Sequence, residues 1–248
     1  MMTIKKTLAG FVAATLIALG FVGLTQTAAS AAVTPFACES AFYQTSQASS
    51  KTQLYKLNVA TSTYSTVGAQ ASIAMNGIGY NPQDNFIYGW VGAKLYQVDS
   101  TGVFTDTGVS VTGVNPSGAD FIGPDIMILT NSSATVQKVV LTRTAGVLSG
   151  GTVSTLTTTG NTGTGYGGAK DIAIFKEGTH YMGYAAEGTS FFTFDFGTSN
   201  SPTNLTYVNR AVSWSPAVAS STFGAQYAEV ASNRCRRWVA PWVVHLGQ

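Results

Sequence analysis

Histidine, the side chain best suited to acid–base chemistry near neutral pH, occurs only twice in the 248 residues. Neither His180 nor His245 has a second histidine or a cysteine at the spacing of zinc ligands, so the sequence does not indicate a zinc site. His180 follows Glu177-Gly178-Thr179, which predicts a hairpin turn that leads into a strand. No Gly-x-Ser-x-Gly motif marks a nucleophilic serine. We therefore assign no catalytic residue and expect no cofactor.

Two aspartates are the candidates for a site at the centre of the molecule. Asp120 and Asp171 occupy related positions in a sequence repeat, and we expect them to point toward a central channel. A ring of carboxylates in such a channel could hold a cation. The other aspartates that follow strand-like segments, Asp84, Asp99 and Asp195, are predicted to end strands and to cap turns.

The glycine-rich segment from Gly163 to Gly168 formally matches a dinucleotide-binding pattern. That motif needs a helix directly after it, because the helix N-terminus holds the pyrophosphate. Residues 172–175, however, are apolar and include two β-branched isoleucines, so residues 171–175 are predicted to be a strand. The sequence therefore predicts a loop between repeats here, without bound nucleotide.

The N-terminus has the three parts of a secretory signal peptide. Lys5 and Lys6 precede an apolar run from Leu8 to Leu24, and a polar stretch then ends in small residues. We expect residues 1–31 to be removed by cleavage between Ala31 and Ala32; the alternative is an uncleaved anchor. The remaining protein is then expected outside the cell or on its wall, with no membrane segment after cleavage.

Removal of that leader leaves 11 basic and 11 acidic residues, so the mature chain is neutral overall. Such a balance, without a basic stripe, makes nucleic acid an unlikely class of partner. The low charge and the abundance of Thr, Ser and Gly predict one all-β domain over residues 32–233, followed by an atypical tail at 234–248. Cys38 and Cys235, near the two ends, form a disulfide in one interpretation and stay unpaired in the other.

A repeat of 41 residues decides the architecture. Leu54-Tyr55-Lys56-Leu57 is followed after 41 residues by Leu95-Tyr96-Gln97-Val98, and Val136-Gln137-Lys138-Val139 stands after 41 more. Within one unit, strands are expected at 79–81, 86–90, 94–99 and 103–108. Repeats of this length with four short strands are typical of β-propeller blades.

A family resemblance points the same way. The order Gly77-Ile78-Gly79-Tyr80-Asn81-Pro82, then Asn85-Phe86-Ile87-Tyr88-Gly89, then Leu95 to Asp99 resembles a repeat of secreted bacterial proteins of unknown function, which is similar to the NHL-type propellers. The resemblance extends from about residue 36 to residue 230. It implies a wheel of sheets with loops on two faces, and a fold of this kind does not fix a function.

The number of blades stays open at this point. The chain starts on the second strand of a unit and ends on a first strand at 223–228, which would close four blades; the alternative is a fragment of a larger wheel. The tail, with Arg234-Cys235-Arg236-Arg237-Trp238, interrupts the repeat. It is either a closing strand (238–246) that pairs with the N-terminal segment or the product of a truncated reading frame.

The leading hypothesis is a secreted, non-catalytic binding or scaffold module whose ligand is a glycan, a wall polymer or another protein. One alternative is an extracellular propeller hydrolase or lyase, which would have to use Asp120, Asp171 and His180. Another is a surface-structural or adhesive repeat protein. The aromatic residues, among them Tyr88, Trp90 and Tyr184, are predicted to fill the core for the most part, although they could also form a sugar-stacking surface.

Overall fold

The computed structural model describes residues 33–37, 42–58, 60–114, 116–131, 135–159, 171–187, 190–211, 223–225 and 243–245. Every described residue lies in the unit Val33–Gln248. The described residues are all-β, and none of them belongs to a helix that could span a membrane. The predictions for the leader, the cleavage site Ala31/Ala32, the pair Cys38 and Cys235, the 163–168 loop and most of the tail fall outside these residues.

The first sheet consists of the antiparallel strands β1 (Phe42–Ala48), β2 (Lys51–Asn58) and β3 (Thr63–Ala71). Ser49 and Ser50 connect β1 to β2, and both have positive φ angles, 51° and 60°. Two-residue hairpin loops favour this conformation because its twist matches that of the flanking strands. Leu54, fully buried on β2, anchors the sheet in the core.

The second sheet has the order β4 (Asn76–Asn81), β5 (Phe86–Val91), β6 (Lys94–Val98) and β7 (Phe104–Ser110). Each strand lies where the repeat predicts one, so this prediction is confirmed. The third sheet repeats the arrangement with β8 (Gly118–Gly123), β9 (Ile126–Thr130), β10 (Val136–Thr144) and β11 (Val147–Thr155). Consecutive residues of β5 and β8 are buried, as expected of strands covered on both faces.

The fourth sheet contains β13 (Ala173–Glu177), β14 (His180–Glu187), β15 (Ser190–Asp195) and β16 (Asn204–Ala211) in antiparallel order. The short strand β12 (Thr157–Thr158) adds to it in parallel beside β16. At the other edge, β17 (Phe223–Ala225) pairs with β14 and with β18 (Val243–His245). Within the predicted closing strand 238–246, the described residues 243–245 pair with β17.

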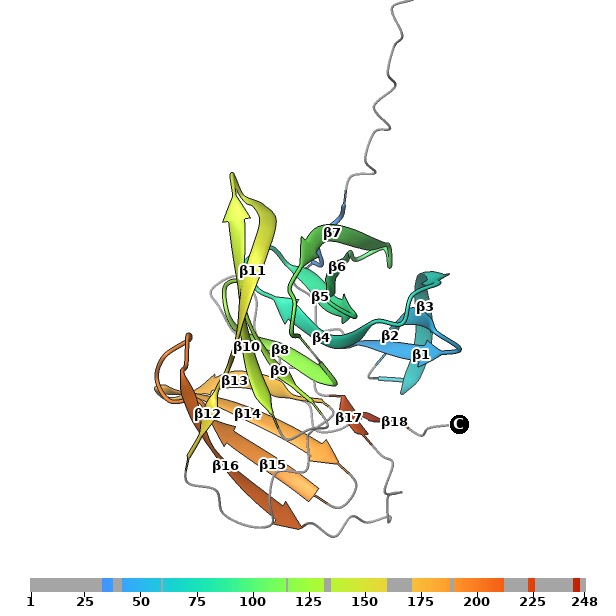
Figure 1. Cartoon of the computed structure of the whole chain (residues 1–248). Helices are drawn as coiled ribbons and strands as arrows, with labels where there is room; N and C mark the ends of the chain where they lie inside the picture. Colours follow the sequence, from blue (N-terminus) through green and yellow to red (C-terminus); the bar gives the residue numbers. More distant parts are fainter. Residues whose placement is uncertain are drawn as a thin grey trace, which may run out of the picture. The chain divides into compact units, whose positions relative to one another are not determined.

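Figure 1 shows the strands of these sheets coloured in chain order. Neighbouring sheets share three hydrophobic clusters. The first cluster joins the first two sheets through Leu54, Met75, Ile87 and Val98. The second joins the β4–β7 and β8–β11 sheets through Tyr88, Trp90, Leu95, Phe121, Met127 and Leu129. The third joins the β8–β11 and β13–β16 sheets through Ile122, Ile128, Val136, Phe192, Phe194 and Leu205. Tyr88 and Trp90 are thus core residues, as predicted.

Two glycines bring the first strands of successive sheets into backbone contact. A Cβ at Gly79 on β4 would stand 2.9 Å from the Cα of Asp120 on β8. At Gly118 on β8, a Cβ would overlap the Cα of Asp171, just before β13. Because a glycine has no Cβ, the backbones can approach this closely at both places. The same close approach therefore recurs from one repeat to the next.

Candidate functional site

The two aspartates predicted to face a channel are bonded to the backbone. Asp120 is 7% exposed; its Oδ2 accepts a hydrogen bond from the N–H of Ile174 at 2.7 Å, and its Oδ1 accepts one from Phe121 at 2.8 Å. The Oδ1 of Asp171 accepts a hydrogen bond from the N–H of Ile172 at 2.9 Å. The bond to Ile174 ties the third sheet to the fourth. Among the described residues, no group of three or more His, Cys, Asp or Glu side chains could hold a metal ion.

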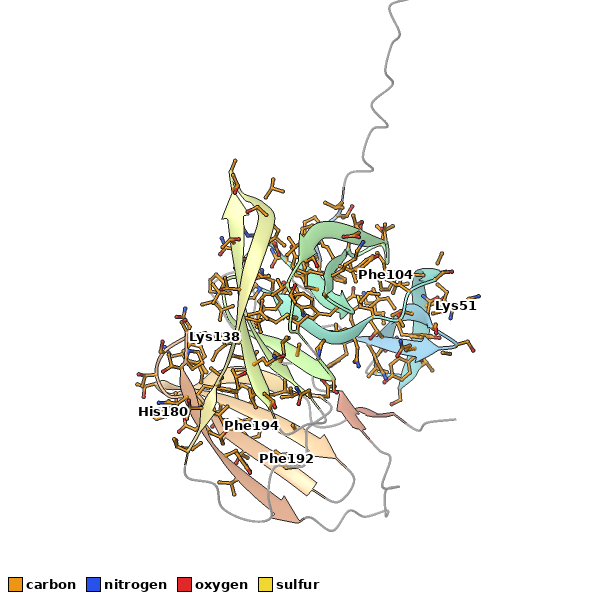
Figure 2. The ribbon with its side chains drawn as sticks, in the orientation of Figure 1. Lys51, Phe104, Lys138, His180, Phe192 and Phe194 are labelled. Carbon is orange, nitrogen blue, oxygen red and sulfur yellow. The ribbon has the colours of Figure 1, made fainter. Side chains whose placement is uncertain are left out.

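His180 begins β14 opposite Glu177, so the predicted hairpin is confirmed. Its side chain is 48% exposed at the edge of the sheet, and its Nδ1 lies 2.9 Å from both carboxylate oxygens of Asp195 (Figure 2). Ile174, the partner of Asp120, precedes Glu177 by three residues along β13, which corresponds to about 10 Å of strand. The structure therefore does not bring His180 together with Asp120.

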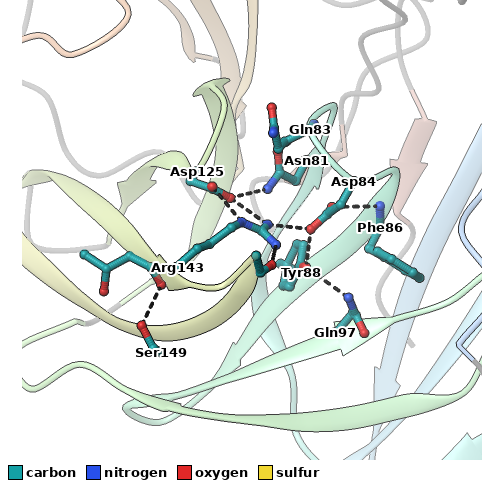
Figure 3. Close-up of polar contacts among 11 residues, drawn as sticks. Asn81, Gln83, Asp84, Phe86, Tyr88, Gln97, Asp125, Arg143 and Ser149 are labelled. Atoms are coloured by element: carbon teal, nitrogen blue, oxygen red, sulfur yellow. Dashed lines mark hydrogen bonds and ion pairs between the residues drawn. The ribbon is translucent and has the colours of Figure 1, made fainter.

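Arg143 lies at the centre of a polar cluster that sequence reasoning missed (Figure 3). From β10, its Nε and Nη2 donate to Oδ2 and Oδ1 of Asp125, each at 2.7 Å. Its Nη2 also donates to Oδ2 of Asp84 at 2.5 Å, and its Nη1 donates to the carbonyl of Gly146 at 3.1 Å. The two-point contact with Asp125 is the strong geometry for an arginine and a carboxylate. Asp84 lies in the β4–β5 turn and Asp125 in the β8–β9 turn, so Arg143 clamps two sheets together.

The neighbours of the clamp fix both carboxylates. Asn81 donates from Nδ2 to Oδ1 of Asp125 at 2.9 Å, and the Tyr88 hydroxyl donates to Oδ2 of Asp84 at 2.7 Å. Gln97 in turn donates to the Tyr88 oxygen at 3.0 Å. Asp125 has a φ of 56°, a left-handed conformation that aspartate tolerates better than most residues. The turn and the cluster therefore both depend on this residue.

Charge and burial shift the pKa values in the cluster. Burial alone raises the pKa of Asp125, but hydrogen bonds from Arg143 and Asn81 outweigh it and hold that pKa below its ordinary value. Burial and the bond to ionised Asp84 raise the pKa of Tyr88. The hydrogen bonds to Asp125 and Asp84 raise the pKa of Arg143 despite partial burial. The shifts of Asp125 and Arg143 favour their charged forms, which is the state that the clamp needs.

The aspartates predicted to cap turns do so. Asp99 accepts hydrogen bonds from the N–H groups of Thr101 and Val103, both at 3.0 Å. Burial by itself raises the pKa of Asp99, and these bonds overcome it, so the pKa lies below its ordinary value. Asp195 accepts from Gly197 at 2.7 Å, and Asp84 from Phe86 at 3.3 Å.

An aromatic diagonal crosses the fourth sheet on the face opposite Phe192 and Phe194. The rings of Phe175 and Tyr184 stack at 5.0 Å with 13° between their planes, and Tyr184 lies 6.0 Å from Phe191. The Tyr184 hydroxyl donates to Oε1 of Glu177 at 2.8 Å. Burial, together with this hydrogen bond and the charge of Glu177, raises the pKa of Tyr184 to about 12.

A family profile described as a repeat of unknown function (DUF6923) matches residues 42–233. The chain belongs to this family. The match covers β1 to β17, so the Arg143 cluster, the close glycine approaches and the aromatic diagonal all lie within DUF6923 sequence. A comparison with curated proteins finds no match.

Proposed function

We propose that this DUF6923 protein is a secreted, non-catalytic binding or scaffold module whose ligand is a glycan, a wall polymer or another protein. Residues 1–31 are its export signal, and it works outside the cell or on the wall. Its four sheets are the blades of a β-propeller, similar to the NHL type of secreted bacterial proteins.

The observation that carries the proposal is that several ionisable side chains of the described sheets hydrogen-bond to other parts of the protein. Asp84, Asp125 and Arg143 clamp two sheets, and Asp120 holds the backbone of the next sheet. Asp99 closes the β6–β7 turn. A general acid or base must present its proton to a substrate, whereas these groups direct their hydrogen bonds to the scaffold. Such a scaffold suits the presentation of a binding surface.

The shared cores and the close glycine approaches support the propeller. Each sheet packs on the next through its apolar face, and the first strands meet at Gly79 and Gly118. Radially repeated four-stranded sheets with close first strands are the arrangement of propeller blades. The loops that join such blades offer surface for a ligand.

Two measurements on the purified secreted protein test the proposed function. Sedimentation with purified cell walls of the source organism measures binding, and incubation with glycan and ester substrate panels measures turnover. We expect saturable wall binding and no product. Product that scales with protein concentration would support a hydrolase or lyase, and absence of binding together with fibre or surface-layer formation would support a structural repeat.

A further inference from the structure

The outer face of the fourth sheet combines flat aromatic rings with hydrogen-bond acceptors. Paired residues of antiparallel strands point to the same face of a sheet. The register pairs Glu177 with His180, Phe175 with Met182, and Tyr184 with Thr193. Asp195 pairs with Met182 and so lies on this face too. We call the set Phe175, Glu177, His180, Tyr184, Phe191 and Asp195 the outer aromatic face.

This face differs from the inner one in burial. Phe192 and Phe194 on the inner face are buried in the core shared with the third sheet, as Figure 2 shows for the two labelled rings. Phe175 and Tyr184 on the outer face are only half-buried, and Glu177 is exposed. The outer aromatic face therefore gives solvent access to two parallel rings and a carboxylate.

We propose that the outer aromatic face binds a neutral glycan chain. This inference rests on the proposed function and names its site and ligand class. The face of an aromatic ring carries negative partial charge, so it attracts the polarised C–H groups on the flat side of a sugar ring. Phe175 and Tyr184 stack on each other, with 5.0 Å between ring centroids and 13° between planes, so the outward ring face of this stack is the platform for such contacts.

The charged side chains beside the platform determine whether the face prefers a neutral or a charged ligand. Glu177 and Asp195 supply carboxylate acceptors for sugar hydroxyl groups. The cross-strand partners of Glu177 and Asp195 are His180, Met182 and Thr206, whereas Arg210 is the register partner of Phe191, four residues before Asp195 on β15. Lys176 points to the other side of β13, where its Nζ lies 5.5 Å from the centre of the Tyr181 ring. Two carboxylates at this end repel an anionic polymer and accept from an uncharged one.

The Tyr184–Glu177 hydrogen bond positions the platform. It joins β14 to the end of β13 and fixes the tyrosine ring against Phe175. Such preorganisation lowers the entropy lost on binding. Glu177→Gln keeps an acceptor oxygen for the Tyr184 hydroxyl but removes the charge, so it is expected to weaken neutral-glycan binding less than loss of the ring itself.

The test measures binding of the purified secreted protein to β-glucan and chitin oligosaccharides by calorimetry, with polygalacturonate as the anionic comparison. Tyr184→Ala and Phe175→Ala should each weaken neutral-glycan binding about tenfold, the effect of losing one stacked aromatic contact with its buried area. Tyr184→Phe keeps the ring and should retain most of the affinity. Tyr64→Ala is the matched control, because Tyr64 is a 44% exposed tyrosine on the first sheet.

Several results would overturn the inference. Equal affinity of all variants would place the site elsewhere, and preference for polygalacturonate would contradict the charge argument. If the protein binds cell walls but neither neutral oligosaccharide, the inference fails while the proposed function stands. Light scattering that shows a dimer dissociated by Tyr184→Ala, without glycan binding, would assign the outer aromatic face to a second copy. If the alanine variants do not fold, Glu177→Gln decides: removal of this charge should raise the affinity for polygalacturonate, and an unchanged affinity would contradict the proposed site.

Discussion

Replacement of Arg143 by methionine should markedly lower the free energy of unfolding. Methionine keeps part of the aliphatic stem but removes the hydrogen bonds that Arg143 donates to Asp84 and Asp125. The three side chains are 20%, 18% and 19% exposed, so the cluster lies between surface and interior. Exposed ion pairs contribute about 0–1 kcal/mol, whereas removal of one partner from a buried pair costs about 3–5 kcal/mol. We expect a loss of about 2–4 kcal/mol, because two partly buried carboxylates are left without their cation.

Urea unfolding followed by tryptophan fluorescence measures this loss, since Trp90 is 1% exposed and becomes solvated on unfolding. With a denaturant slope of about 2–3 kcal/mol per molar, the midpoint should fall by about 1 M. Lys94→Met is the control, because the Lys94–Asp106 pair is exposed and its loss should leave the midpoint unchanged. An Arg143→Met midpoint equal to that of the control would refute the interpretation of the cluster as a clamp between sheets.

Three further predictions concern the packing between repeats, acid stability and export. Gly118→Ala should destabilise the protein by about 1–3 kcal/mol because the added Cβ overlaps the Asp171 backbone; Gly150→Ala, whose Cβ meets only the Thr142 hydroxyl at 3.2 Å, should cost far less in the same urea assay. The folded-state pKa of Asp125 is depressed below the ordinary value of about 3.9. Its contribution to the free energy of unfolding is therefore complete above about pH 5 and is lost as the pH falls through the folded-state pKa. Urea midpoints measured against pH should therefore fall less steeply below about pH 4 in Asp125→Asn than in the wild type. N-terminal sequencing of the secreted protein should begin at or close to Ala32, and a membrane-bound chain that starts at Met1 would contradict the export signal.

The repeat predicted most of the fold because it is a local signal. Turn residues such as Asn81-Pro82 and Asp99 stand at fixed intervals between apolar segments, and the strands of the second sheet follow from them. The pairing of Val243–His245 with β17 could not be predicted, because a three-residue strand carries little pattern of its own. The close glycine approaches were also missed: Gly79 and Gly118 appear as turn or strand glycines until the neighbouring backbone is known.

The side-chain sites were harder to predict than the strands. Asp84 is 59 residues from Arg143, and nothing in the local sequence of either indicates the other. Asp125 offered a partial signal, since it follows Gly123-Pro124 in a turn that needs a residue tolerant of positive φ. The outer aromatic face depends on register: Phe175, Tyr184 and Phe191 become a diagonal only when three strands are aligned. Sequence periodicity alone does not give that alignment.

The most direct test of the central claim is a binding isotherm of the purified protein with solubilised cell-wall fragments, followed by mass spectrometry of the recovered fragments. A non-catalytic binding module predicts saturable binding and fragments of unchanged mass. Fragments recovered shorter or with a new unsaturated end would contradict the account and identify a hydrolase or a lyase.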